Sequence, residues 1–316
     1  MTPQLNLFGY ENQEDDVSKR IDAYNKDHCW QYDIRLKNLE SDLVMSGISH
    51  EEAKQISISD FSFDYIHSEN KSQCQRVKRF IERHEWLGKM PNRPTHRFSC
   101  CWKGNMIGVI VMSTPNAFSN LLGKENKDKE KLISRGACIS WSPKNTASWL
   151  IMRSIRWMVN NTEFRYFTAY SDPEARELGT IYQACNFYYL GQSFGSNKMY
   201  LDPENTKKGW FSDREFRKQS KYKLYADKAG IAKNEFEKYL GKWTPRWEKM
   251  PMGMKDTIKK EEQKYRDSCL ARKAGSKHKY VYVLGKNKKE TKELKRLFKK
   301  NNPNIDPFKY PKERGT

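Results

Sequence analysis

The stretch FTAYSDP (167–173), followed by GTIYQACNFYYLG (179–191), decides how this chain is interpreted. An apolar run that ends at Asp-Pro predicts a buried strand closed by a turn. The second stretch predicts a helix that carries a row of tyrosines and stops at Gly191. An acidic side chain and phenols would then meet at one strand end, where α/β proteins keep their functional groups. In the alternative interpretation, Asp172 only caps the turn and the aromatic rings only fill the core.

The composition indicates a globular protein with much charged surface. A length of 316 residues allows one large domain or two ordinary ones. Its 37% of hydrophobic residues are enough for a core, and its 31% of charged residues imply much solvated surface. No run approaches the roughly 18 apolar residues that span a bilayer, and the first residues do not resemble a signal peptide. We therefore expect no membrane partner and a cytoplasmic location. The seven cysteines are scattered without a Cys-x-x-Cys pair, which predicts reduced thiols.

Positive charge is concentrated in the last third of the chain. Residues 207–316 contain 33 Lys and Arg against 14 Asp and Glu, a net charge of +19 out of +20 for the whole chain. Cations that alternate with aromatic rings or form dense runs favour contact with phosphates and bases. We predict DNA as the partner, and the candidate contact residues are Lys242, Arg246, Lys277, Lys279, Lys288, Lys289, Lys295 and Arg296. The alternative is that these lysines form an ordinary solvated surface.

Three regions follow from the pattern along the chain. Residues 1–56 predict a helical N-terminal arm, to which we assign no chemistry. Residues 57–204 predict a domain of alternating helices and strands, and residues 205–316 predict a basic extension that binds nucleic acid, with one strand over 280–284. The elements expected in the middle region, before the opening stretch, are a helix over 74–85, a hairpin over 97–112, a strand over 136–141 and a helix over 145–160.

The order of these elements resembles the GNAT acyltransferase fold. The motifs EWLG (85–88), Arg135, PKNTAS (143–148), YSDP (170–173) and IYQA (181–184) together resemble the Mom family. Members of that family are phage GNAT-like proteins that modify adenine in DNA to N6-methylcarbamoyl-adenine. The resemblance covers about residues 60–204. It implies an α+β fold, a GNAT-like mixed sheet flanked by helices, beside the helical arm and the basic C-terminal extension.

The resemblance also implies a cofactor, acetyl-CoA or a related acyl-CoA. The helix that starts near Asn145, with Thr146 and Ser148 in its first turn, suits the donor pyrophosphate through its free N–H groups. Most GNAT proteins have a glycine-rich loop at this place; this chain has none, a departure that the Mom family shares. Arg135 is similar to the family's arginine linked to donor binding. A surface salt bridge for Arg135, and plain helix capping by Asn145 and Ser148, are the structural alternatives.

Acyl transfer to an amine needs a group that accepts the amine's proton and an acid that protonates the leaving thiolate. Asp172 resembles the family's functional aspartate and is the candidate for orienting or deprotonating the amine. Tyr182 corresponds to the family's tyrosine and is the candidate acid. Tyr188 and Tyr189 are its rivals, because many GNAT enzymes carry the equivalent tyrosine nearer the terminal glycine.

The candidates for contact with the substrate are Glu85, Trp86 and Tyr170. Glu85-Trp86 stands where Mom proteins carry His-Tyr, so the chemistry on the base side or the acyl group could differ here. Trp86 is suited to stacking on a flipped base, although a core position is the alternative. The six histidines show no metal-binding spacing, and we predict no protein-built metal site. The family resemblance leaves an iron requirement open.

Two functions from different classes fit these observations. The first is a phage-type DNA-modifying acyltransferase that transfers an acyl-derived group from a CoA thioester to an exocyclic amine of a base, with adenine N6 favoured. The second is a catalytically altered GNAT-like domain that binds nucleic acid or serves in assembly, since a fold does not fix a function. The joint presence of Asp172, Tyr182, Arg135 and Ser148 favours the enzyme. The basic extension argues against an ordinary acetyltransferase of proteins or small amines.

Overall fold

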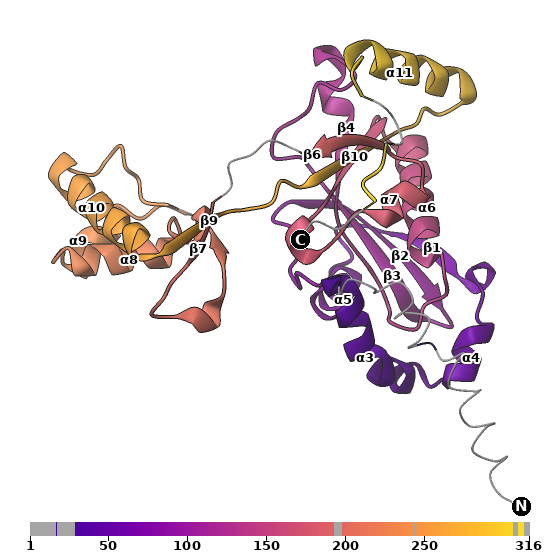
Figure 1. The fold of residues 1–316 in the computed structure, drawn as a ribbon, viewed down its shortest axis with the longest axis horizontal. Helices are drawn as coiled ribbons and strands as arrows, with labels where there is room; N and C mark the ends of the chain where they lie inside the picture. The colour runs from indigo at the N-terminus through magenta and orange to yellow at the C-terminus, as the bar shows by residue number, and fades with distance from the viewer. Residues whose placement is uncertain (1–16, 18–28, 193–197, 243, 306–308, 313–316) are drawn as a thin grey trace, which may run out of the picture. The chain divides into compact units, whose positions relative to one another are not determined.

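The computed structural model describes residues 17, 29–192, 198–242, 244–305 and 309–312 (Figure 1). Contacts divide the chain into two compact units. The first unit comprises Met1–Ser193 together with Lys277–Thr316, and the second comprises Phe194–Ser276. These limits differ from the sequence-predicted boundaries after residues 56 and 204, because the end of the chain returns to the first unit.

A seven-stranded mixed sheet forms the centre of the first unit. All neighbouring strands are antiparallel except β4 and β5, which are parallel. In spatial order the strands are β1 (Ser62–Ile66), β2 (Pro94–Trp102), β3 (Asn105–Ser113), β4 (Glu130–Cys138), β5 (Tyr166–Ser171), β10 (His278–Val283) and β6 (Tyr188–Gln192). This sheet with its flanking helices confirms the predicted α+β class. The predicted hairpin is β2 and β3, and β4 begins earlier than the strand expected over 136–141.

Helices cover this sheet, and Figure 1 shows α5 and α6 on either side of its β2–β4 part. They bury apolar side chains such as Val77 and Ile81 on α5, and Leu150 and Ile155 on α6. The predicted arm is mostly helical where the structure describes it, with a capping box at Ser49 and Glu52. Residues 1–16 and 18–28 of the arm lie outside the described residues. The helices of the first unit are α3 (Trp30–Ser46), α4 (His50–Gln55), α5 (Lys71–His84), α6 (Thr146–Asn161), α7 (Thr180–Ala184) and α11 (Lys288–Asn301).

The single long helix predicted over 179–191 is wrong. Helix α7 ends at Ala184, and Asn186 takes a left-handed conformation with a φ of 58°. The chain then continues as β6, in which Tyr188 and Tyr189 pair with Val281 and Tyr280 of β10. This segment forms a strand because backbone hydrogen bonds to β10 stabilise it. Strand β10 follows much later in the sequence, so the local pattern does not reveal this partner.

The second unit is an insertion into a β-hairpin. Strands β6 and β10 are antiparallel neighbours, and Gln192 pairs with His278, so Phe194–Ser276 connects two adjacent strands. The return to the sheet has an apolar cause, because Tyr280, Val281 and Val283 are buried in the core of the first unit. The strand predicted over 280–284 is therefore present, but it belongs to the central sheet and not to a separate extension.

The second unit has its own small sheet and core. Its strands lie in the order β8 (Phe211–Ser212), β7 (Lys198–Leu201) and β9 (Leu270–Lys273). Its helices are α8 (Gln219–Lys228), α9 (Lys233–Glu237) and α10 (Met252–Ser268). The core contains Tyr222, Tyr225, Phe236 and Ile258. Residues 194–276 carry 21 Lys and Arg against 12 Asp and Glu, and residues 277–316 carry 13 against 4, so each part has a net charge of +9.

Candidate functional site

The sheet opens between the second halves of β4 and β5. Their parallel pairing runs only from Glu130 and Tyr166 to Ile133 and Ala169. Beyond that point β4 continues beside β3 and β5 continues beside β10, each to its end. The register of β4 against β3 shifts at Ser134, where the opening begins. Two neighbouring strands thus present backbone groups to a gap, which is a place for a ligand that forms strand-like hydrogen bonds.

Two carboxyl groups lie at this opening, one from the end of α5 and one from the loop after β5. Glu177 accepts hydrogen bonds from the Trp86 Nε1 at 3.0 Å and from the Asp172 backbone N at 3.1 Å. Glu85 accepts from the Gly88 backbone N at 3.1 Å, and its Oε1 lies 3.7 Å from the Nε of Arg135. The sequence motifs around Glu85 and Asp172 therefore meet in space, as the candidate site requires.

Burial raises the pKa values of the acidic groups in this cluster. It raises the pKa of Glu85 to about 7, against the lowering effect of Arg135 and with a further increase from Glu177. Burial also raises the pKa of Glu177. The pKa of the Tyr182 phenol is raised by burial and by the nearby Glu177 and Glu85 carboxylates. At neutral pH, Glu85 is therefore poised between its two protonation states while Tyr182 keeps its proton.

Asp172 has a structural role and a charged partner. It caps the short 3₁₀ helix Pro173–Ala175 and accepts a hydrogen bond from the Glu174 N at 3.1 Å, as the structural alternative predicts. Its Oδ2 also lies 2.8 Å from the Nζ of Lys277, and the Asp172 side chain keeps 15% of its surface exposed. The structure places Lys277, a candidate DNA contact, beside the expected active-site aspartate.

The three candidate tyrosines have different surroundings. Tyr182 lies on α7 between the rings of Phe187 and Tyr280, with centroids 5.3 and 5.4 Å away. The Tyr189 hydroxyl is 2.8 Å from the Nδ1 of His278. Tyr188 stacks at 4.8 Å on Phe298 of α11. Of the three phenols, Tyr182 is the one whose pKa the two carboxylates influence.

The start of α6 fits an anion better than a side-chain cap. Asn145 takes a left-handed conformation with a φ of 67° and makes no side-chain capping hydrogen bond. The hydroxyls of Thr146 and Ser148 donate to the carbonyl oxygens of Pro143 and Asn145, at 2.8 and 3.0 Å. The Thr146 N–H donates to the Pro143 oxygen at 3.3 Å, but the Asn145 side chain does not cap the N–H groups that follow in the first turn, and a phosphate is a suitable acceptor for them.

The remaining candidate residues lie in different parts of the structure. Arg135 donates to the backbone oxygens of Lys89 and Ser134 at 2.7 and 2.6 Å, so it joins β4 to the segment after α5. Tyr170 is 39% exposed on β5, with the Nζ of Lys279 at 5.8 Å from its ring centroid. Lys242 and Arg246 belong to the second unit, whereas Lys288, Lys289, Lys295 and Arg296 lie on α11 of the first.

Sequence reasoning missed two residues that contribute to this cluster. Glu177 lies five residues after Asp172 in the same loop. Its place in the cluster follows from the hydrogen bond with Trp86, a residue distant in the sequence. Gln31 of the N-terminal arm accepts from the Trp86 backbone N at 3.2 Å and donates to the His84 oxygen at 2.7 Å. The arm, to which no chemistry was assigned, therefore helps to hold Trp86 at the site.

In the part of the chain that the structure describes, no three His, Cys, Asp or Glu side chains gather in a way that could hold a metal ion. The donor set of this cluster does not fit an iron site. None of the helices in the described ranges has both the length and the apolar character needed to cross a membrane.

The family comparison decides the assignment. The sequence model of the Mom protein family matches residues 69–312, which is more than half of the chain. The chain belongs to the Mom family. The match extends well past the region 60–204 and includes both β10 and α11, so the returning C-terminal segment is part of what this Mom family protein shares with its relatives. No curated protein matches the sequence.

Solved structures similar to this Mom family protein include three with TM-scores of 0.32. The ribosomal-protein-S5-alanine acetyltransferase from Vibrio fischeri has 14% identity, and the match covers 44% of this chain and 85% of that one. Arabidopsis thaliana NAA60, in complex with a bisubstrate analogue, has 8% identity, with 72% and 99% covered. A tandem GNAT protein from the clavulanic acid biosynthesis pathway has 8% identity, with 66% of each chain covered. At these scores the likeness alone establishes neither activity nor substrate. Family membership and the opened β4–β5 pair together support an acyltransferase-like fold.

Proposed function

We propose that this protein transfers an acyl-derived group from a CoA thioester to an exocyclic amine of a DNA base, with the adenine N6 amine favoured. The observation that carries the proposal is the β4–β5 opening, beside which lie a carboxyl group with a pKa of about 7 and a phenol that stays protonated. Membership of the Mom family supports DNA as the acceptor.

A CoA thioester, when bound, supplies an activated acyl carbon and a thiolate leaving group. The start of α6 would hold its pyrophosphate, because the Asn145 side chain does not cap the first turn and a helix N-terminus favours anions. The opening between β4 and β5 would receive the pantetheine part, whose amides can bond to the exposed strand backbones. Arg135 is already bonded to two backbone oxygens, so its proposed role here is to hold the site and tune Glu85.

Glu85 and Tyr182 have matched protonation states for the transfer. At neutral pH the ionised fraction of Glu85 can accept the proton that the amine loses when its nitrogen attacks the acyl carbon. Tyr182 retains its phenolic proton and can donate it to sulfur as the C–S bond breaks. One proton leaves the amine and one reaches the thiolate, so transfer of a proton from Glu85 to Tyr182 restores both groups.

Asp172 is proposed to orient the amine and not to be the sole base. Its Oδ2 already faces the Lys277 ammonium at 2.8 Å, an arrangement that fixes the carboxylate in one position. The other carboxylate oxygen, Oδ1, accepts from the Glu174 backbone N. A carboxylate held in this way can still accept a hydrogen bond from an amine, because each oxygen has a further lone pair.

Donor binding tests this function. We expect calorimetry on the purified protein to show binding of CoA at least about tenfold tighter than binding of pantetheine, which lacks the pyrophosphate. Equal affinity for both ligands would place the pyrophosphate elsewhere than at α6. A protein that binds neither at millimolar concentration is not a CoA-dependent enzyme.

The second candidate, a GNAT-like protein that only binds nucleic acid or serves in assembly, also has a specific observation in its favour. Asp172 and Arg135 both make contacts that stabilise the fold, a cap with an ion pair and a link between β4 and the segment after α5. Such contacts would persist without catalysis. DNA binding without any CoA binding would favour this candidate.

A further inference from the structure

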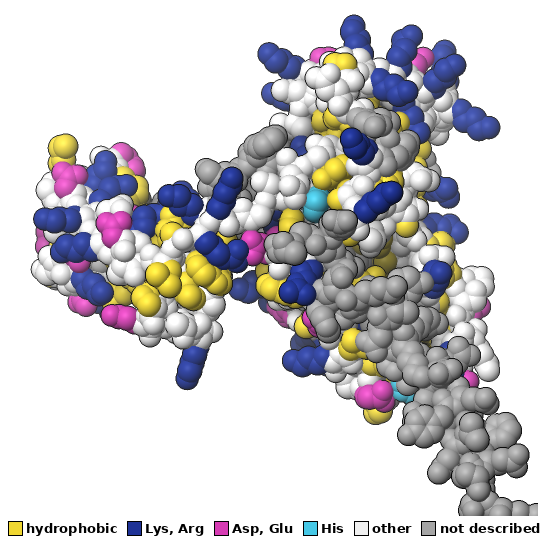
Figure 2. Space-filling model, viewed as in Figure 1, with side chains coloured by type: hydrophobic (Ala, Val, Ile, Leu, Met, Phe, Trp, Pro, Cys, Tyr) yellow, Lys and Arg dark blue, Asp and Glu magenta, His cyan; other side chains and the backbone are white. Residues whose placement is uncertain are grey.

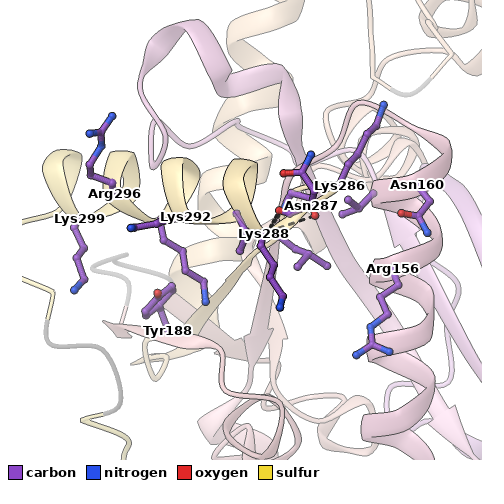
Figure 3. Close-up of a pocket in the computed structure, with 14 residues that line it drawn as sticks. Arg156, Asn160, Tyr188, Lys286, Asn287, Lys288, Lys292, Arg296 and Lys299 are labelled. Carbon is purple, nitrogen blue, oxygen red and sulfur yellow. Dashed lines mark hydrogen bonds between the residues drawn. The ribbon is translucent and has the colours of Figure 1, made fainter.

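A basic groove lies between α6 and α11 in the first unit, at the end of β10 that leads into Leu284 and Gly285. Its volume is about 960 Å³. Helix α6 contributes Arg156 and Asn160, and Figure 3 shows Arg156 on one side with Lys288 and Lys292 of α11 opposite. The cations from α11 and its preceding loop are Lys286, Lys288, Lys292, Lys295, Arg296 and Lys299. None of the described residues that line the groove is Asp or Glu.

Helix α11 is divided into an apolar side and a basic side. Leu294 and Phe298 are buried in the first unit, and Phe298 stacks on Tyr188. Four groove lysines follow one another at intervals of four, three and four residues, which places them on one face of the helix: Lys288, Lys292, Lys295 and Lys299. Figure 2 shows Lys and Arg side chains projecting around α11. Like charges at this spacing repel one another, so the stripe is suited to an anionic partner.

The acid in the first turn of α11 does not neutralise the stripe. Glu290 accepts from the Nε of Arg165 at 2.6 Å and from the Lys286 backbone N at 2.5 Å, so it serves to fix the start of the helix. Glu163 lies 3.5 Å from the Nζ of Lys286, at the edge of the groove. Glu293 lies on α11 but does not line the groove. The positive charge of the groove is therefore largely uncompensated by its own lining.

We infer that this groove binds the phosphate backbone of the DNA substrate, an inference that rests on the proposed function. From Lys288 to Lys299 the helix rises by about 16 Å, which matches about five steps of one strand of a duplex. A phosphate backbone is a regular line of negative charges, and this face presents a regular line of positive ones. Contacts to phosphates carry no sequence information, so we expect this contact to be independent of sequence.

The groove is separate from the catalytic opening. Along β5 and β10, the end near the groove is the pair Tyr166 and Val283, and the end near Asp172 is the pair Ser171 and His278. These ends are five residue steps apart along the strand, a distance of about 17 Å. A duplex bound in the groove is therefore contacted several base pairs away from the base that reacts, and the groove would anchor the DNA rather than select the base.

The test compares two double charge reversals in the first unit of the full-length protein. Lys292→Glu with Lys299→Glu alters the groove, whereas Lys300→Glu with Lys309→Glu makes the same change in charge at two exposed positions that do not line it. Fluorescence anisotropy with a labelled duplex of about 30 base pairs, over a range of salt concentrations, measures affinity. We expect the groove variant to lose at least about tenfold in affinity and to have a shallower salt slope by about two, while the control loses less than about threefold. Circular dichroism melting confirms that both variants fold.

Several results would overturn the inference. Equal losses of affinity in both variants would mean that DNA is attracted diffusely to the basic C-terminal segment. No loss of affinity in either variant, or no duplex binding by the wild type, would mean that the groove is not the DNA site. Displacement of the duplex by poly-glutamate at equal charge concentration would make the groove a general polyanion site. Failure of this inference is distinguishable from failure of the proposed function. Duplex binding through the groove without any modified base would support the groove but contradict the enzymatic function. Modified bases formed in equal amounts by both variants would support the enzymatic function but contradict the role of the groove.

Discussion

The indole nitrogen of Trp86 donates a hydrogen bond of 3.0 Å to Glu177, a residue 91 positions later in the chain. The same carboxylate accepts from the backbone N of Asp172. One partly buried acid thus ties the segment after α5 to the loop after β5, the segments that carry Glu85 and Asp172 of the proposed site.

We expect Glu177→Gln to shift the pH profile of kcat/KM to lower pH. Glu177 raises the pKa of Glu85, so removal of its negative charge lets Glu85 ionise below pH 7. The amide keeps one acceptor oxygen and so cannot preserve both hydrogen bonds, from Trp86 and from the Asp172 backbone N, in their present geometry, and we expect kcat to fall about tenfold. A pH profile measured with saturating acyl-CoA and with DNA well below its KM checks the shift in kcat/KM, and saturating DNA checks kcat. An unchanged profile with full activity would mean that Glu177 only fills space.

Arg135→Gln should shift the same profile in the opposite direction. The guanidinium holds the pKa of Glu85 down, and its removal raises that pKa above about 7. Activity at pH 7 then falls but recovers as the pH is raised, because Glu85 is still present to ionise. Recovery at high pH separates this tuning role from a direct contact with the donor, for which CoA affinity would fall at every pH.

Glu85→Gln tests the same carboxyl group through stability. The folded-state pKa of Glu85 is about 7, above its ordinary value of 4.5. The contribution of Glu85 to the free energy of unfolding is therefore fully present below about pH 4.5 and is lost as the pH rises through 7. The raised pKa corresponds to a destabilisation of the folded state by up to about 3 kcal/mol at pH 8. Relative to the wild type, Glu85→Gln should therefore gain stability at pH 8 compared with pH 4.5. Urea unfolding at the two pH values measures this, and a constant difference would refute the raised pKa.

The insertion of the second unit makes a deletion testable. Because Gln192 pairs with His278, replacing residues 194–276 by a short Gly-containing turn should leave a β6–β10 hairpin and a cooperatively folded first unit. A chain that ends near residue 204 should instead fail to fold, because it lacks β10 from within the sheet. Thermal unfolding followed by circular dichroism compares the two. A broad, non-cooperative transition in the internal deletion would show that the second unit is required for folding.

Local sequence patterns predicted those elements that depend on local contacts. The hairpin of β2 and β3 and helix α6 follow from alternation, turn residues and helical periodicity within a few residues. Strand β6 could not be predicted in this way. Its tyrosines fit a helix until β10, which enters the sheet only after the whole second unit, provides the pairing partner.

The site was also only partly predictable, because local motifs indicate some of its residues and not others. Asp172, Tyr182 and Arg135 stand in motifs that resemble those of a family, and the structure brings their segments to one opening. Glu177 gives no such signal, because its role depends on Trp86 from another segment. The tuning of Glu85 depends on burial and on two charged neighbours, which no local pattern contains.

Mass spectrometry of nucleosides shows whether the β4–β5 opening catalyses acyl transfer to DNA. DNA from cells that express the wild type, Tyr182→Phe or Tyr188→Phe would be digested and its nucleosides weighed. We predict a base with an added acyl-derived mass, on adenine if N6 is the acceptor, from the wild type and from Tyr188→Phe. Tyr182→Phe should lower its amount by about a hundredfold or more, because the thiolate loses its acid. No added mass from a folded wild type that binds CoA, or an equal amount from Tyr182→Phe, would contradict the account.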